Sequence, residues 1–317
     1  MLAAHIASGA ISLIETPRPR LRKGFSLLRL RLAGICNTDI ELLRGYYGFA
    51  GIPGHEFVAD VVASSDPNLT GKRVVGEINL ACGHCADCRS GFGRHCLKRT
   101  VLGILGHPGA FAEYLTLPTA NLFPLPHSIP DEHAVFTEPI AAACEILDQV
   151  RFPRGARVAV LGDGKLGLLI AQVLHIHGCD TTLLGRNASK LALLPLPTRL
   201  LDRHQPSLPA AAFTHVVDAT GSAEGLQSAL TLVRPRGTII LKSTVNDRFP
   251  IDMARVIVNE ISLIGSRCGR FAPALRLLRS RRLILNPMIH AQYPLARAPE
   301  AFAHAQSPRV LKVLLTP

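Results

Sequence analysis

Four cysteines lie close together in one short stretch of the sequence. Their spacing is C-x2-C-x2-C-x7-C, formed by Cys82, Cys85, Cys88 and Cys96. Four thiolates so close together can surround one tetrahedral ion, and zinc is the ion that a closed all-sulfur site prefers. The alternative is a pair of disulfides, which needs an oxidising compartment. Because no secretory signal is evident at the N-terminus, a structural zinc site is the prediction.

A second set of possible metal ligands precedes the four cysteines. Cys36 stands in the run GICNTD, and His55 and Glu56 follow further along in GHEF. A thiolate, an imidazole and a carboxylate make an open zinc site whose fourth position is left to water or substrate. The alternative is that Cys36 is a buried, inert cysteine. The sequence therefore predicts a catalytic zinc site here, with that alternative open.

A glycine-rich turn stands in the middle of the chain. The run GDGKLG at 162–167 follows an apolar stretch at 157–161, which predicts a strand, and opens a predicted helix at 166–177. This is the context that the dinucleotide-binding fingerprint requires, with the phosphates at the helix N-terminus. An ordinary glycine-rich turn between strand and helix is the alternative. The residues expected to bind the cofactor in this turn are Gly162, Gly164, Lys165, Leu166 and Gly167.

The end of the next predicted strand, at 181–184, bears on the choice between NAD and NADP. Chains that select NAD usually place an acid there to bind the ribose 2′-hydroxyl. This chain continues with Gly185, Arg186 and Asn187, and Lys190 follows. Gly185 leaves room where the acid would lie, and the two cations can meet a 2′-phosphate. We therefore expect NADP to be preferred and NAD to be possible; the alternative is a solvated arginine, with NAD bound without a strong anchor.

Composition limits the class of protein. The chain has 317 residues, 48% of them hydrophobic, enough for about two domains with sizeable cores. No run of apolar residues is long enough for a membrane span. The net charge of +12 is compatible with nucleic-acid binding, but aromatic residues make up only 5% and the arginines are dispersed. We expect neither a nucleic-acid nor a membrane partner, and the cysteine usage suits the cytoplasm.

Three blocks follow one another along the chain. Residues 1–141 alternate short strands, such as 27–32 and 57–62, with turns rich in proline and glycine, which is typical of a β-rich domain. Residues 142–269 alternate apolar strands with helical stretches, which indicates a parallel α/β sheet. The stretch 194–209, with four prolines, is expected to be an irregular connection. The strands expected in the second block are 157–161, 181–184, 215–219, 238–241 and 262–264; the tail, 270–317, is expected to hold a helix at 273–279 and a strand at 311–315.

In order along nearly the whole chain, these motifs resemble those of the zinc-containing medium-chain dehydrogenases, the superfamily of alcohol, polyol, glucose and threonine dehydrogenases. The resemblance implies an α/β protein with a GroES-like catalytic domain, a Rossmann domain and a tail that returns to the catalytic domain. It also implies a homodimer or homotetramer. The motifs that carry it are GICNTD at 34–39, PGHEF at 53–57, the four-cysteine lobe at 82–96, GAFAEY at 109–114, Glu138-Pro139 and GDGKLG at 162–167.

The resemblance implies roles for individual residues. Cys36 and His55 match the two fixed ligands of the catalytic zinc, and some combination of Glu56, Glu138 and water completes the metal. Thr38 matches the hydroxyl that begins the proton relay. The alternatives are that Thr38 stabilises a turn and that Glu138 caps a helix.

The implied activity is reversible hydride transfer between an alcohol, polyol or sugar hydroxyl, or its carbonyl, and NAD(P), with two zinc ions per chain. One alternative is a zinc-site protein of the same fold without dehydrogenase activity, acting as a regulator or binding nucleic acid. Another is a zinc-free reductase of the same superfamily. The pair Cys36 and His55 argues against that second alternative.

Overall fold

The computed structural model describes residues 1–201, 210–242 and 250–317. The chain forms two compact units, and the predicted α/β class is confirmed. The first unit contains Met1–Glu138, Ala274–Arg279 and Leu285–Pro317. The second contains Pro139–Pro273 and Ser280–Ile284.

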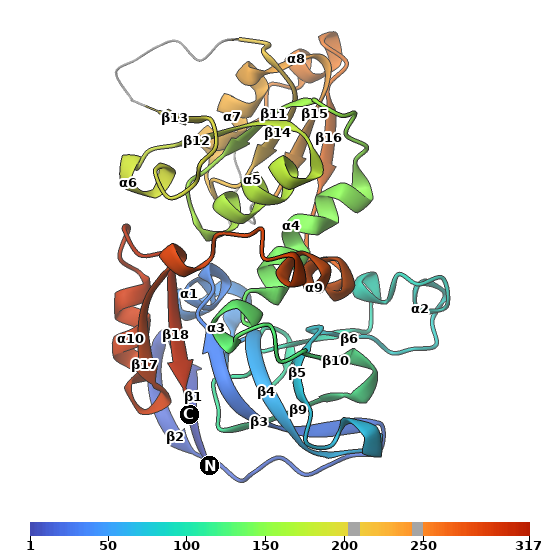
Figure 1. Cartoon of the computed structure of the whole chain (residues 1–317), viewed down its shortest axis with the longest axis vertical. Coiled ribbons are helices and arrows are strands. Elements are labelled where there is room, and N and C mark those ends of the chain that lie inside the picture. Colours follow the sequence, from blue (N-terminus) through green and yellow to red (C-terminus); the bar gives the residue numbers. More distant parts are fainter. Residues whose placement is uncertain (202–209, 243–249) are drawn as a thin grey trace. The chain divides into compact units, whose positions relative to one another are not determined.

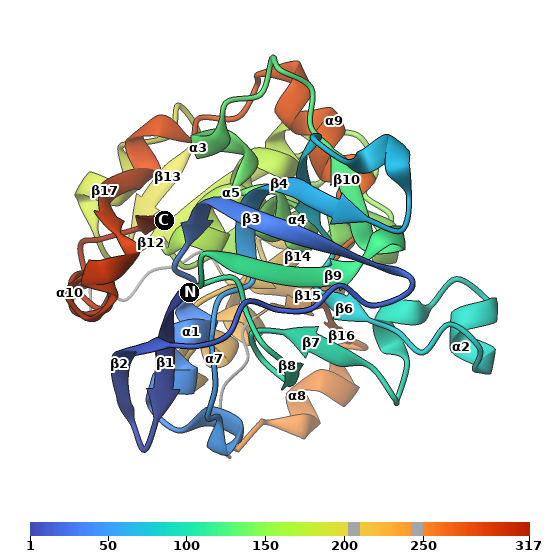
Figure 2. The same ribbon diagram turned by 90° about the horizontal axis from the view of Figure 1, so that it is seen from below.

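A seven-stranded sheet organises the first unit, with the order β10-β5-β4-β3-β18-β17 and with β9 also paired to β3 (Figures 1 and 2). In β3, Leu28, Leu30 and Leu32 are buried, while Arg29 and Arg31 between them are exposed. This period of two is what a strand with one face on the core requires. The strands are β3 (Phe25–Gly34), β4 (Glu56–Ser64), β5 (Arg73–Gly76), β9 (Tyr114–Pro118), β10 (Leu122–Pro124), β17 (Ile289–Pro294) and β18 (Lys312–Thr316).

The C-terminal strand enters the middle of this sheet. β18 lies antiparallel to β3 and parallel to β17. Its Leu314 is the partner of Gly34 in β3, and Gly34 is in turn the partner of Glu56 in β4. The predicted tail strand at 311–315 is thus confirmed as β18, and it brings the end of the chain beside the start of β4.

Smaller elements complete the first unit. The four-cysteine lobe projects from a three-stranded sheet, β6-β7-β8, as the teal segment with α2 in Figures 1 and 2. These elements are β1 (Leu2–Ala7), β2 (Ala10–Glu15), β6 (Asn79–Leu80), β7 (Thr100–Leu102), β8 (Gly106–His107), α1 (Asn37–Leu43), α2 (Ala86–Arg89), α3 (Asp131–Ala134) and α10 (Ala298–Ala305).

The second unit is built on a six-stranded sheet in which every pair is parallel (Figure 1). Its order, β13-β12-β11-β14-β15-β16, is the 3-2-1-4-5-6 order of the Rossmann fold. In β11, Val158 to Leu161 are all buried, as expected of a strand covered on both faces. The strands are β11 (Arg157–Leu161), β12 (Asp180–Gly185), β13 (Thr198–Leu200), β14 (Phe213–Asp218), β15 (Val233–Leu241) and β16 (Ser262–Gly265).

The five strands predicted for this sheet are confirmed as β11, β12, β14, β15 and β16, but β13 was not predicted. It lies in the stretch 194–209, expected to be irregular, so that expectation is wrong for Thr198–Leu200. A single pairing partner, β12, at the sheet edge lets a short proline-flanked segment become a strand. Residues 202–209 of the same stretch lie outside the described residues.

Helices cover the sheet of the second unit. α5 packs against β11 and β12, and α7 packs against β11, β14 and β15. The predicted helices are confirmed, at 166–177 as α5 and at 273–279 as α9. In the part of the chain that is described, no helix is long and apolar enough to cross a membrane. The helices of this unit are α4 (Thr137–Gln149), α5 (Lys165–His177), α6 (Ala188–Leu191), α7 (Ala223–Leu232) and α8 (Met253–Val258). Most of α9 (Phe271–Ser280) belongs to the first unit, which contains Ala274–Arg279.

Candidate metal centres and cofactor site

The four clustered cysteines meet in space. Their Sγ atoms all lie within 4.8 Å of one another. The Sγ of Cys85 is 3.4 Å from that of Cys88 and 3.8 Å from that of Cys96, and Cys82 and Cys88 are 3.9 Å apart. Zinc–sulfur bonds of about 2.3 Å in a tetrahedron separate the sulfurs by about 3.8 Å. The sulfur cage therefore has the size that zinc requires.

Backbone hydrogen bonds favour the thiolate form of Cys82, whereas burial and the neighbouring cysteines raise the pKa of Cys88 to about 12. Hydrogen bonds from the backbone at His84 and Cys85 lower the pKa of Cys82 to about 6. The thiolate is the form of cysteine that binds metal. All eight cysteines of the chain are free of disulfides, so the cysteine pairs weighed as an alternative are not formed.

A second group of donors meets at the start of β4. One donor atom each from Cys36, His55 and Glu56 lies within 4.8 Å of the other two. Cys36 precedes α1 as its N-cap residue, and Glu56 is the first residue of β4. His55 is 3% exposed and Glu56 is 1% exposed. Cys36 is half-buried, so the structure gathers two buried predicted ligands and one half-buried one at a single point.

Asp39 holds this second group together. Its Oδ2 accepts the N–H of Cys36 at 2.8 Å, and its Oδ1 accepts the N–H of Gly54 at 3.1 Å. Oδ1 also lies 3.3 Å from Nδ1 of His55, at ion-pair distance although no hydrogen bond is aligned between them. Burial lowers the pKa of His55, but the charges of Asp39 and Cys36 outweigh it and raise the pKa well above its ordinary value. An acid behind the ring orients a metal-binding histidine.

Glu56 has one oxygen paired and one unpaired. Its Oε2 accepts a hydrogen bond from Nζ of Lys312, and both side chains are 1% exposed. Its Oε1 is buried and has no hydrogen-bond partner among the described residues. A Cβ on Gly34 would lie 2.6 Å from Oε2, so the glycine leaves room for the Glu56 carboxylate in its observed position. A buried, unpartnered carboxylate oxygen beside a thiolate and an imidazole fits a bound zinc ion.

Lys312 was missed by sequence reasoning. The signal was present, because Lys312 is the single charged residue in the apolar run Leu311 to Leu315. A lysine at a position where its neighbours are buried needs an acidic partner. Nothing in the local sequence names that partner as Glu56.

The other two predicted catalytic residues lie at helix starts. Thr38 is in α1, with Oγ1 3.8 Å from the Sγ of Cys36. Glu138 is half-buried in the first turn of α4. Among the described residues, Glu138 does not join the donors that meet at Cys36. The metal-binding role of Glu138 thus stays a prediction, as does the alternative that it caps α4.

The glycine-rich turn has the geometry that its motif predicts. Gly162 has φ +111°, and a Cβ there would lie 2.6 Å from the carbonyl oxygen of Ala219. A Cβ on Gly167 would lie 1.9 Å from the carbonyl oxygen of Gly162, so α5 packs closely on the turn. Gly164, the N-cap residue of α5, faces open space, with no atom within 4 Å of a Cβ position. This open backbone at a helix N-terminus fits a pyrophosphate.

The end of β12 differs from the sequence-based interpretation. The space beside Gly185 is occupied by Asp163 of the glycine-rich turn: a Cβ on Gly185 would lie 2.5 Å from its Oδ2. That oxygen accepts the N–H groups of Arg186 and Asn187, both at 2.6 Å. The interpretation that Gly185 leaves open room is therefore wrong. An acid at the first variable position of GDGKLG was the signal that could have indicated this.

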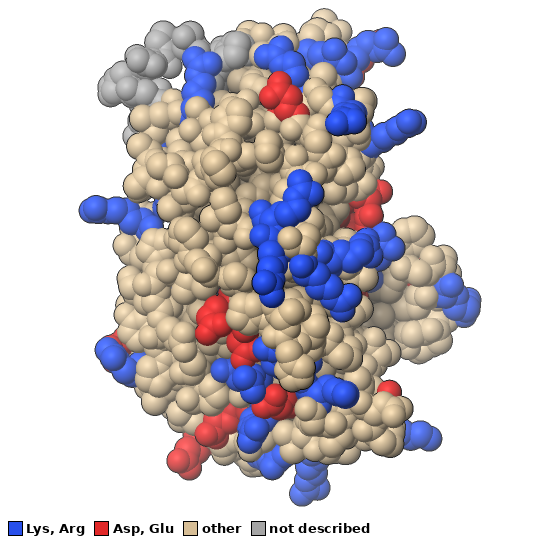
Figure 3. Space-filling model, in the orientation of Figure 1, with Lys and Arg blue, Asp and Glu red and all other residues tan. Residues whose placement is uncertain are grey.

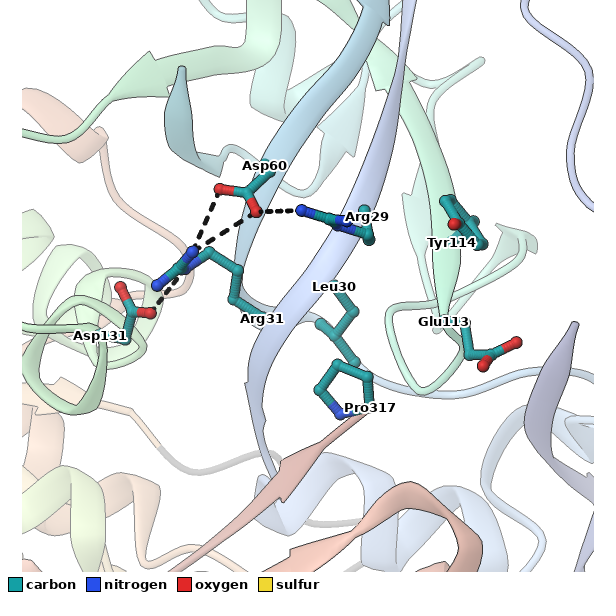
Figure 4. Close-up of a pocket in the computed structure, with 8 residues that line it drawn as sticks. All are labelled: Arg29, Leu30, Arg31, Asp60, Glu113, Tyr114, Asp131 and Pro317. Atoms are coloured by element: carbon teal, nitrogen blue, oxygen red, sulfur yellow. Dashed lines mark hydrogen bonds and ion pairs between the residues drawn. The ribbon is translucent and has the colours of Figure 1, made fainter. Parts of the chain in front are cut away.

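A hollow of about 440 Å³ lies elsewhere in the first unit and is lined by none of the predicted site residues (Figure 4). Arg29 and Arg31 both reach Asp60, at 3.1 and 3.4 Å, and Arg31 also reaches Asp131 at 2.7 Å. Asp60 and Asp131 are thus already paired with arginines, and Glu113 accepts the backbone N–H of Leu2 at 2.8 Å. The hollow is not among the groups of metal donors found in the described residues. We assign it no role in the chemistry.

Comparison with known proteins points to one family. The model described as the alcohol dehydrogenase GroES-like domain matches residues 22–127. The D-altritol 5-dehydrogenase of Agrobacterium fabrum is 31% identical, with 97% of each chain covered. An L-threonine 3-dehydrogenase of Streptomyces avermitilis is 30% identical, with 99% of this chain and 98% of that protein covered. A zinc-binding dehydrogenase of Sinorhizobium meliloti, solved with bound NADP, matches with a TM-score of 0.90 and 26% identity, over 100% of this chain and 99% of that one.

Proposed function

Because the chain belongs to the zinc-containing medium-chain dehydrogenase/reductase superfamily, we propose that it is an NAD(P)-dependent oxidoreductase that transfers hydride reversibly between an alcohol or polyol hydroxyl, or its carbonyl, and the cofactor. The observation that carries the proposal is the meeting within 4.8 Å of half-buried Cys36 with buried His55 and Glu56. The unpartnered Oε1 of Glu56 supports it.

Cys36 and His55 are the proposed fixed ligands of the catalytic zinc, with Glu56 or Glu138 completing the site. A zinc ion held there supplies a Lewis acid that lowers the pKa of a substrate hydroxyl or polarises a carbonyl. Asp39 keeps the ring of His55 in place through its contact at Nδ1. Thr38, whose hydroxyl lies 3.8 Å from the Sγ of Cys36, is proposed to carry the substrate proton toward solvent.

The four-cysteine lobe is the proposed second zinc site, which gives two zinc ions per chain. Its ligands fill a tetrahedron and leave no position for substrate. Such a site contributes folding energy and no chemistry. We propose that it stabilises the lobe between β6 and β7.

The proposed cofactor contacts are the open backbone of the glycine-rich turn and the end of β12. NADP is bound in the Sinorhizobium meliloti relative, and we extend that cofactor to this chain as the preferred one. Arg186 is exposed and Lys190 half-buried just beyond β12, where either cation can approach a 2′-phosphate. NAD, which lacks that phosphate, is proposed as the second cofactor.

The substrate class follows the relatives. A polyol dehydrogenase and a threonine dehydrogenase are similar over nearly the whole chain, so we propose a small molecule with a secondary hydroxyl beside further polar groups. A regulator or nucleic-acid-binding protein is not favoured. On the face drawn in Figure 3, several Lys and Arg side chains lie beside one another near the centre, and Asp and Glu side chains lie among the cations in the lower part.

We also propose a homodimer or homotetramer that works in the cytoplasm. The free cysteines support a reducing compartment, since zinc-bound thiolates are lost on oxidation. Light scattering coupled to size-exclusion chromatography tests the assembly, and a monomer at micromolar concentration contradicts it.

An activity screen tests the proposed function. The zinc-loaded protein is assayed with NADP and NAD over polyols, aldoses, threonine and short aldehydes. Activity with at least one substrate, lost in Cys36→Ser while cofactor binding remains, supports the proposal. Full activity in Cys36→Ser excludes the catalytic zinc site.

A further inference from the structure

A carboxylate from the glycine-rich turn stands at the end of β12. Asp163 lies between Gly162 and Gly164, yet its Oδ2 accepts the N–H groups of Arg186 and Asn187. Two donors at 2.6 Å on one oxygen make a firm contact for a charged acceptor. In Rossmann domains the acid that binds the ribose 2′-hydroxyl stands at this strand end, but it comes from the strand itself.

The neighbouring residues make room for this carboxylate. Gly185 has no Cβ, and one placed there would lie 2.5 Å from both the Cβ and the Oδ2 of Asp163. The glycine thus serves the packing of Asp163. Burial lowers the pKa of Lys190, and the negative charge of Asp163 opposes this shift, so the carboxylate acts on this lysine as well.

These groups are the ones that a 2′-phosphate needs. An anion at a strand end is bound by backbone N–H groups and by nearby cations. Here the N–H groups of Arg186 and Asn187 already hold an anion, and its charge also reaches Lys190. A 2′-phosphate at the same place would find the two N–H donors already occupied, and the Asp163 carboxylate would repel it.

We propose that Asp163 determines cofactor specificity, because its carboxylate holds the donors at the end of β12 and so weakens NADP binding relative to NAD. The inference rests on the proposed use of NAD(P). It means that the attraction of Arg186 and Lys190 for the 2′-phosphate is opposed by a residue of the glycine-rich turn. The preference for NADP is correspondingly reduced.

The test is Asp163→Asn, measured by titrating the zinc-loaded protein with NADPH and with NADH and following the fluorescence of the bound nicotinamide. The amide oxygen of Asn can accept the same two N–H groups, so the turn is kept and only the charge is removed. We expect the ratio of the two dissociation constants to move toward NADPH by at least about tenfold. The control is Asp180→Asn, because Asp180 is an exposed acid at the other end of β12.

A second variant keeps the test valid if Asp163→Asn does not fold. Asp163→Ser also removes the charge while its hydroxyl can accept one N–H group, and circular dichroism checks that both variants are folded. A shift toward NADPH in the folded variants, absent in Asp180→Asn, supports the inference. An unchanged ratio in a variant that still binds either cofactor overturns the inference and leaves the proposed function standing. If the wild-type protein binds neither NADPH nor NADH, both the inference and the proposed function are overturned.

Discussion

Lys312 and Glu56 form an ion pair that is 1% exposed on both sides, although 256 residues separate them in the chain. The pair forms because β18 lies beside β3 and β3 lies beside β4. It also leaves only one oxygen of Glu56, Oε1, for a metal or a metal-bound water. The end of the chain therefore takes part in shaping the candidate catalytic zinc site.

Lys312→Met should destabilise the first unit, because Glu56 is left buried without its partner. Loss of one member of a buried ion pair typically costs about 3–5 kcal/mol. The double variant Lys312→Met with Glu56→Gln should recover most of this loss. Urea unfolding measures both, with Lys72→Met as an exposed control. Equal stability of the single and double variants would contradict a coupled pair.

Cys88→Ser should lower the zinc content from two ions per chain to one and reduce solubility or folding yield. The reason is that a structural zinc site supplies folding energy only when its ligand set is complete. Elemental analysis and thermal unfolding measure the effect. Cys144→Ala is the matched control, since Cys144 is buried outside both groups of donors and should keep two zinc ions. Two zinc ions in Cys88→Ser would count against the site.

Glu138→Gln tests the residue that the structure leaves apart from the donor group. If Glu138 completes the metal in the working enzyme, turnover falls at least about tenfold, which is about 1.4 kcal/mol in barrier. Zinc content and the pH–rate profile change with it. We expect this outcome. Glu132→Gln, an exposed acid in α3, is the control.

The helix-cap alternative gives a different result for the same variant. As a cap in the first turn of α4, Glu138 contributes about 1 kcal/mol of stability. Its replacement would then lower stability by that amount while zinc content and the pH–rate profile stay as in the wild type. That pattern would remove Glu138 from the site.

His107 should make the fold sensitive to acid. Burial lowers its pKa, and the charge of Arg22 lowers it further, while the hydrogen bond of its Nε2 with the carbonyl of Thr116 opposes the shift. Since the folded pKa lies below the ordinary value of 6.5, the stabilising contribution is complete above that pH and is lost as the pH falls toward the folded pKa.

The measurement is the free energy of unfolding between about pH 5 and pH 8. His107→Gln retains a donor for the carbonyl of Thr116 and should show a flatter decline on the acid side. His127→Gln is the control, because His127 is exposed. An equally steep decline in His107→Gln and the wild type would rule out this contribution.

Local sequence was enough to predict much of this protein. The buried run at 157–161, the glycines at 162, 164 and 167 and the cysteine spacing each act over a few residues, and the structure forms the elements that they indicate. Backbone period, turn conformation and ligand spacing are local properties, which is why a single chain reveals them.

Tertiary structure decided which distant side chains share a site. Lys312 reaches Glu56 only because β18 enters the first sheet, and Asp163 reaches the end of β12 only because parallel strands bring their carboxyl ends to one edge. β13 became a strand through pairing with β12 and not through its own composition. Contacts of this kind depend on strand order and side-chain direction. The local sequence around one of the two residues specifies neither.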